Sequence, residues 1–118
     1  DTTLLDKRKE AFQLKVSDDQ LYVTGSDAHG VAYGILEISR LIGVSPWEWW
    51  ADVMPLKRSS FSLANGYVNL QAPSVEFRGI FINDEDWGLM PWSSLHYEPW
   101  HKPGRIGPKT NARIFELM

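Results

Sequence analysis

The fold is decided by the stretch Val75-Glu76-Phe77-Arg78-Gly79-Ile80-Phe81-Ile82-Asn83-Asp84-Glu85-Asp86. Residues of β-branched or aromatic character run straight into four consecutive polar residues. Such a continuous apolar run is typical of a strand buried on both faces, as in a parallel sheet covered by helices. Ligands gather at the carboxyl ends of such strands. We therefore expect Asn83, Asp84 and Glu85 at the mouth of a site. The alternative is an acidic, solvated turn.

Composition limits the classes of function. With 118 residues the chain is one ordinary domain, or one small domain with part of another. A net charge of -3, with Lys and Arg in small scattered groups, argues against nucleic acid and anionic membrane as partners. The absence of Cys excludes a disulfide framework and a thiolate metal site. The chain begins with Asp1, so we expect the natural amino terminus to lie upstream.

The first quarter of the chain has the pattern of a β-hairpin. Residues 11–16 alternate apolar and polar side chains, residues 17–20 supply turn chemistry, and residues 21–25 resume as a second strand. We expect the two strands to pair in an antiparallel manner.

An amphipathic helix is predicted next. Ser26 or Asp27 can cap its start and Gly43 can end it. Gly30 and Gly34 lie inside it, which indicates close approach to the sheet. A phosphate loop is the alternative, but the spacing and the Lys of that motif are absent. The apolar residues that recur at three- and four-residue intervals are Val31, Ile35, Ile38 and Leu41/Ile42.

Between this helix and the apolar run we expect two strands and a linker. The tryptophans at positions 47, 49 and 50 are predicted to pack rather than to face solvent. Residues 59–64 and 67–70 are predicted strands, with a turn at Asn65-Gly66. Residues 71–74 form a linker, which places a first domain at 1–72 and a second at 73–118.

A long loop and a helix follow the acidic strand end. The loop runs from Trp87 to Gly104, and loops of this length are usually functional or disordered. Pro108 fits the first position of a helix. Its apolar face is still forming at Met118, so we expect the natural polypeptide to continue.

The chemistry of the polar residues points to no single site. Glycoside hydrolysis needs two carboxyl groups on opposite sides of the scissile bond, and neighbours on one strand end seldom satisfy that. A second carboxyl group would come from another strand. His29, His96 and His101 lack metal-ligand spacing, although Glu98 between the last two leaves zinc as a weak alternative.

Several motifs nevertheless resemble one known family. Residues 25–34 are similar to a helix start in the small α/β domain that precedes the catalytic barrel of several glycosidases. Three further motifs and the helix start at 106–110 resemble glycoside hydrolase family 115, the xylan α-1,2-glucuronidases. Those three motifs are Gly43-Val44-Ser45-Pro46-Trp47, Trp49-Trp50-Ala51-Asp52-Val53 and Arg78-Gly79-Ile80-Phe81-Ile82-Asn83-Asp84-Glu85.

The resemblance implies an α/β fold class. An amino-terminal α/β sandwich domain (1–72) would precede the first strand, loop and helix of a truncated TIM-type (β/α)8 barrel (73–118). It implies removal of 4-O-methyl-glucuronic acid or glucuronic acid from xylan by an inverting mechanism, without metal or cofactor. The site residues would be Asp84 and Glu85 as catalytic groups, with Asn83, Asp86, Trp87 and Trp92 binding substrate.

The chain departs from the family because it ends after one β/α unit. The general acid would then lie outside it, so we expect the isolated chain to be inactive. Expected partners are glucuronoxylan or its oligosaccharides, the rest of the barrel and, as an option, a second copy in a homodimer. The resemblance suggests a periplasmic or secreted protein. The alternative function is a non-catalytic carbohydrate-binding or interaction module that stacks sugars on Trp87, Trp92, Tyr97 and Trp100.

Overall fold

The computed structural model describes residues 3–45, 47–48, 53–82, 88–100 and 104–116. The chain forms two compact units, Asp1–Glu76 (unit 1) and Phe77–Met118 (unit 2). Among the described residues, no helix has the length and apolar character needed to cross a membrane. The assignment of residues 1–72 to a sandwich domain and of 73–118 to a barrel stays a prediction.

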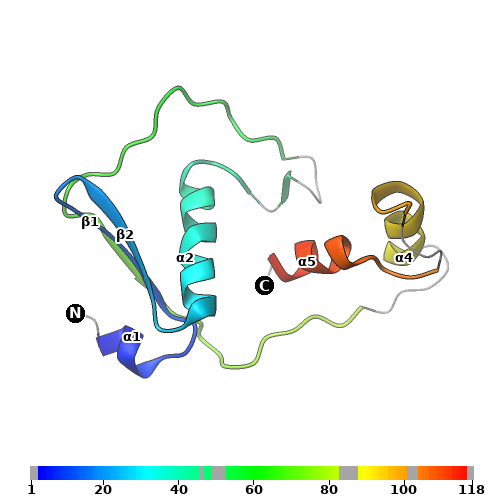
Figure 1. The fold of residues 1–118 in the computed structure, drawn as a ribbon, viewed down its shortest axis with the longest axis horizontal. Coiled ribbons are helices and arrows are strands. Elements are labelled where there is room, and N and C mark those ends of the chain that lie inside the picture. The colour runs from blue at the N-terminus through cyan, green and yellow to red at the C-terminus, as the bar shows by residue number, and fades with distance from the viewer. Residues whose placement is uncertain (1–2, 46, 49–52, 83–87, 101–103, 117–118) are drawn as a thin grey trace. The chain divides into compact units, whose positions relative to one another are not determined.

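The elements follow one another as shown in Figure 1. Unit 1 contains, in chain order, α1 (Thr3–Lys7), β1 (Phe12–Ser17), β2 (Gln20–Gly25), α2 (Ala28–Leu41) and β3 (Val68–Gln71). Unit 2 contains α4 (Leu89–Trp92), the π-helix η1 (Ser93–Tyr97) and α5 (Pro108–Glu116).

The predicted hairpin is confirmed. β1 and β2 pair antiparallel from Phe12 opposite Gly25 to Ser17 opposite Gln20. The connecting residues Asp18 and Asp19 both have positive φ, 52° and 58°. A two-residue loop with this backbone follows the right-handed twist of the strands, and Asp tolerates the left-handed region better than most residues.

A third strand completes the sheet in the order β2-β1-β3. β3 pairs antiparallel with β1 and confirms the strand predicted at 67–70, after a turn in which Gly66 has φ +85°. The strand predicted at 59–64 is wrong, because this segment has no regular structure. Only Leu63 in it is even half-buried, so little apolar burial offsets the entropy of ordering it.

The helix α2 begins and ends as predicted. The side chain of Asp27 accepts a hydrogen bond from the Gly30 N–H at 2.8 Å. At the other end Gly43 has φ +96° and donates to the Arg40 carbonyl at 3.0 Å, while Val44 donates to that of Ser39 at 2.9 Å. These two bonds form a Schellman motif, which satisfies carbonyls that the helix leaves without a partner.

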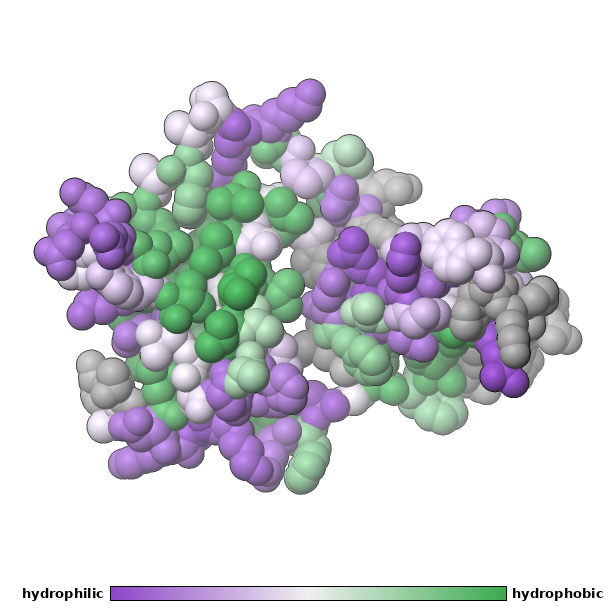
Figure 2. Space-filling model, viewed as in Figure 1, coloured by the Kyte–Doolittle hydropathy of each residue, from purple (hydrophilic) through white to green (hydrophobic). Residues whose placement is uncertain are grey.

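Glycine determines which side of α2 meets the sheet. A Cβ at Gly30 would lie 2.1 Å from the Ala11 carbonyl oxygen, and one at Gly34 would lie 2.7 Å from Val23. The predicted close approach is thus confirmed. The apolar stripe instead forms an exposed flank, with Val31 38% and Ile35 55% exposed. Figure 2 shows apolar side chains gathered over α2.

A buried carboxylate takes part in the contact between α2 and β3. Glu37 is 8% exposed and accepts two hydrogen bonds of 2.6 Å from Arg40. Asn69 donates to it at 2.9 Å and Gln71 at 3.4 Å. The pKa of Glu37 is held below its usual value, mainly by the hydrogen bond from Arg40, while burial acts in the opposite direction.

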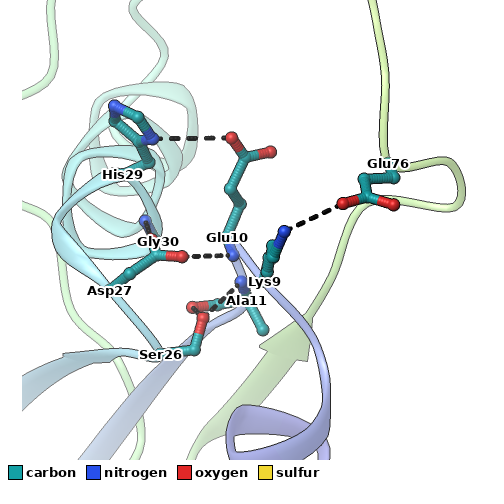
Figure 3. A network of polar contacts seen from close by, with 8 residues as sticks. All are labelled: Lys9, Glu10, Ala11, Ser26, Asp27, His29, Gly30 and Glu76. Carbon is teal, nitrogen blue, oxygen red and sulfur yellow. Dashed lines mark hydrogen bonds and ion pairs between the residues drawn. The ribbon is translucent and has the colours of Figure 1, made fainter.

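Polar contacts fix the start of β1 to the start of α2 (Figure 3). The backbone N–H of Glu10 donates to Asp27 at 2.8 Å, and that of Ala11 donates to the Ser26 hydroxyl at 3.0 Å. The Glu10 carboxylate lies 3.5 Å from Nδ1 of His29. Asp27 therefore serves both as the helix cap and as an acceptor for the chain segment that enters the sheet.

The buried strand predicted over residues 75–82 is not present. Residues 77–82 belong to no sheet, and Phe77 and Phe81 are 88% and 91% exposed. A parallel strand needs hydrogen-bonded neighbours and covering helices, and the described residues supply neither to this segment. The start of a barrel is therefore not seen in the described part of unit 2.

Two other predictions need correction. The loop from Trp87 to Gly104 contains regular structure, because α4 and η1 occupy residues 89–97. The Trp47 side chain is 55% exposed rather than packed. Trp49 and Trp50, also predicted to pack, lie outside the described residues.

We predict that Gly30→Ala destabilises unit 1 by about 1 to 3 kcal/mol, because the new methyl group would collide with a backbone oxygen that cannot move independently. Urea unfolding monitored by circular dichroism measures the change. Gly79→Ala is the matched control, since a Cβ there meets nothing within 4 Å. Equal midpoints for the two variants would contradict the close packing of α2.

We also predict an acid dependence from the helix cap. The hydrogen bond from the Gly30 N–H, followed by that from Glu10, holds the pKa of Asp27 below its ordinary value. The stability that ionised Asp27 contributes to the fold is therefore fully present above its unfolded pKa of about 3.9, and it is lost as the pH falls through its lower pKa in the folded state. Asp27→Asn keeps an acceptor but cannot titrate, so its stability should fall less between about pH 5 and about pH 2. Parallel pH profiles of the two proteins would refute this.

Candidate functional site

The structure covers the predicted site only in part. Asn83, Asp84, Glu85, Asp86 and Trp87 lie outside the described residues, so their roles stay predictions. Trp92 is described. It ends α4, where its side chain is 37% exposed. The structure therefore describes the residues before and after the predicted acidic segment in the sequence, but not the segment itself.

The centre of unit 2 is a buried polar cluster formed by Ser93, Glu98, Gly107 and Thr110. Ser93, Glu98 and Thr110 are each 0% exposed. The Glu98 carboxylate accepts hydrogen bonds from the backbone N–H groups of Lys109 at 3.1 Å and Thr110 at 2.8 Å. It also accepts from the Thr110 hydroxyl at 2.9 Å. These donors replace the hydrogen bonds to water that the carboxylate loses on burial.

The donor and the acceptor can be assigned for each hydroxyl hydrogen bond of the cluster. Because a carboxylate only accepts, the Thr110 hydroxyl donates to Glu98, and the Ser93 hydroxyl then donates to Thr110 across 2.7 Å. The Gly107 N–H donates in turn to Ser93 at 2.9 Å. The result is a continuous chain of hydrogen bonds that ends on Glu98, in which each member polarises the next.

This cluster explains how α5 begins. The helix starts at Pro108, as predicted, and Gly107 precedes it as the cap residue. Gly107 has no side chain to accept from the first free N–H groups, so Glu98 supplies the acceptor from another segment. A Cβ at Gly107 would lie 2.1 Å from a Glu98 oxygen, so glycine also leaves the space that the carboxylate occupies. In the sequence, the sign that another residue must cap α5 was that Gly107, before the predicted helix start at Pro108, has no side chain that could do so.

The aromatic residues of unit 2 are not equivalent. Trp92 and Tyr97 stack on one another, with ring centroids 5.5 Å apart and planes 10° from parallel. Trp100 is 65% exposed, and the Lys109 ammonium lies over its ring at 4.7 Å from the centroid. The wider turn of η1 favours the Trp92–Tyr97 pair, because residues five apart come together there.

The acidic residues of unit 2 also divide into two groups. Glu98 is buried and bound to α5, and Glu116 pairs with Arg113 at 2.7 Å on the exposed surface. The remaining three are Asp84, Glu85 and Asp86. Glu98 thus has a structural partner. The weak zinc alternative placed Glu98 between His96 and His101, and His101 lies outside the described residues. In the described part of the chain, no three His, Asp or Glu side chains gather as metal ligands.

We predict that Glu98→Gln exposes the start of α5 to solvent exchange. The amide can accept from only part of the donor set and brings an NH2 group toward other donors, which costs about 1 to 3 kcal/mol for each buried group left without a partner. Hydrogen exchange of the Thr110 amide measures this directly. Glu116→Gln, which alters an exposed ion pair, should leave the Thr110 protection within about 0.5 kcal/mol of the unmodified chain. Unchanged protection in Glu98→Gln would contradict the capping role.

Comparison with known proteins identifies the family. Residues 70–118 match the family described as Glycosyl hydrolase family 115. Among solved structures, the chain is similar to a family GH115 4-O-methyl-alpha-glucuronidase with specificity for decorated arabinogalactans, at 67% sequence identity and a TM-score of 0.85. This similarity covers 96% of the present chain and 15% of the chain that it matches. No protein of curated function matches the sequence. The chain described here belongs to glycoside hydrolase family 115.

Proposed function

We propose that this chain is part of an enzyme that removes 4-O-methyl-glucuronic acid or glucuronic acid side groups from a polysaccharide. The observation that carries the proposal is the 67% identity to a 4-O-methyl-alpha-glucuronidase over 96% of the chain. That relative has specificity for decorated arabinogalactans. We therefore place decorated arabinogalactan ahead of the xylan that the sequence motifs suggest.

The proposed catalytic groups are Asp84 and Glu85. They follow an apolar run. Two of the other three acidic residues of unit 2 are engaged elsewhere, Glu98 with the start of α5 and Glu116 with Arg113. Asn83, Asp86, Trp87 and Trp92 are proposed to bind the sugar. In this arrangement Asp84 or Glu85 orients the uronic acid or the attacking water.

The proposed reaction proceeds with inversion. One carboxylate takes a proton from water while an acid on the opposite side of the sugar protonates the leaving oxygen, across about 6.5 to 9.5 Å. Two side chains adjacent in sequence do not span a sugar from both sides. We therefore place the general acid outside residues 77–118. Because carboxylates repel a uronate, a cation near the sugar is also required.

The isolated chain is proposed to be inactive. The segment that leads into Asp84 has no strand neighbours among the described residues, and its Phe77 and Phe81 side chains are exposed. A catalytic carboxylate needs fixed geometry, which an unpaired segment does not provide.

A chimera tests the proposal. This chain replaces the matching 15% of the solved arabinogalactan-specific relative. Asp84→Asn and Glu85→Gln are then measured on glucuronidated arabinogalactan and on glucuronoxylan. We expect kcat to fall by about 100-fold to 10,000-fold in at least one of them. Glu116→Gln is the matched control and should keep full activity. The isolated chain should release no uronic acid.

The outcomes separate the candidate functions. Full activity of both Asp84→Asn and Glu85→Gln would exclude the catalytic assignment and favour a module that only binds carbohydrate. Proton NMR of the first product decides the stereochemistry, since inversion of an α-linkage releases the β-anomer. A first product in the α form would refute inversion while leaving the glucuronidase assignment intact.

A further inference from the structure

Trp100 and Lys109 form an exposed cation–π pair in unit 2. The Trp100 side chain is 65% exposed, and the Lys109 ammonium lies 4.7 Å from its ring centroid. Trp92 and Tyr97, by contrast, stack on each other and each covers a face of the other. Among the described aromatic residues of η1 and its surroundings, Trp100 therefore offers the most accessible indole surface.

The buried Glu98 holds the two residues of this pair in place. It lies two positions before Trp100 in the chain, and its carboxylate accepts a hydrogen bond from the backbone N–H of Lys109 itself. Because Glu98 is fully buried, both backbone segments are tied to the same rigid point. The backbone positions of Trp100 and Lys109 are thus held near each other, while the Lys109 side chain remains free to move its ammonium.

The charge of Lys109 is not explained by the fold. It lies in the first turn of α5, where the helix dipole disfavours a cation. Among the described residues, its ammonium lies within ion-pair distance of no carboxylate; Glu98 contacts its backbone instead. The first N–H groups of α5 are occupied by Glu98, so an external anion at this position would meet Lys109 rather than the helix terminus.

We propose that Trp100 and Lys109 form a binding subsite for a uronic acid residue. The indole face contacts the C–H face of the sugar ring, and the ammonium pairs with the sugar carboxylate. The flexible stem of Lys109 allows its charge to move from the ring face to a carboxylate at the ring edge. The choice of a uronic acid rests on the proposed function, and the subsite supplies a cation of the kind that this function requires.

An NMR titration of the 118-residue chain tests the subsite. The probes are methyl α-D-glucuronide and the neutral methyl α-D-glucoside, and the reporter is the indole N–H of Trp100. We expect the glucuronide to bind about twofold to fivefold more tightly than the glucoside, as for an exposed ion pair. Lys109→Met should remove this difference, and Trp100→Ala should weaken binding of both sugars.

Two variants elsewhere serve as matched controls. Trp47→Ala removes another exposed tryptophan, 55% exposed, and Lys15→Met removes an exposed lysine of β1. Both should leave the titration unchanged. If circular dichroism shows that Trp100→Ala does not fold, Trp100→Tyr replaces it and should retain the preference for the glucuronide. Absence of any shift at Trp100, or an unchanged preference in Lys109→Met, would overturn the subsite.

The same titration separates this inference from the proposed function. A chimera that releases uronic acid while the chain shows no glucuronide preference overturns the subsite and leaves the enzyme assignment standing. A chain that shows the preference while the chimera is inactive supports the subsite and counts against the enzyme assignment.

Discussion

The buried Glu98 carboxylate at the start of α5 is the contact on which unit 2 depends. A carboxylate loses its hydration on burial, and here backbone N–H groups and hydroxyl groups replace the water. The helix gains an acceptor that Gly107 cannot provide. The same hydrogen bonds therefore satisfy both a helix terminus and a buried charge, and they connect the end of η1 to α5. This connection matters because, among the described apolar side chains of unit 2, only Ile114 is buried.

Unit 1 is organised by a different constraint, the close approach of a helix to a hairpin. Gly30 and Gly34 allow the backbone of α2 to lie against Ala11 and Val23, where a Cβ would collide. This packing directs the apolar flank of α2 away from the sheet. It also places Glu37 against β3, where the hydrogen bonds from Arg40, Asn69 and Gln71 lower its pKa. Both units thus bury a carboxylate that neighbouring donors satisfy.

For the proposed enzyme, the structure changes which residues need a functional explanation. Glu98 has a structural role, and the proposed catalytic carboxylates are therefore sought in the acidic segment at 84–86, which lies outside the described residues. Among the aromatic residues, Trp92 stacks on Tyr97, which leaves one of its faces covered, whereas Trp100 contacts Lys109 and is 65% exposed. The Lys109 ammonium is a cation within unit 2, of the kind that the proposed function requires near the sugar.

Local patterns were sufficient for the hairpin, the Asp27 cap, the Gly43 terminus and the start of α5, because each depends on neighbouring residues whose backbone preferences agree. Motif resemblance was sufficient for the family. Contacts between residues distant in sequence were not predictable. Glu98 caps a helix through Lys109, which lies eleven positions later in the chain. The side of α2 that packs depends on the close approach of Gly30 to Ala11. The segment at 77–82 shows the same limit, since an apolar run forms a buried strand only where other strands supply its hydrogen bonds.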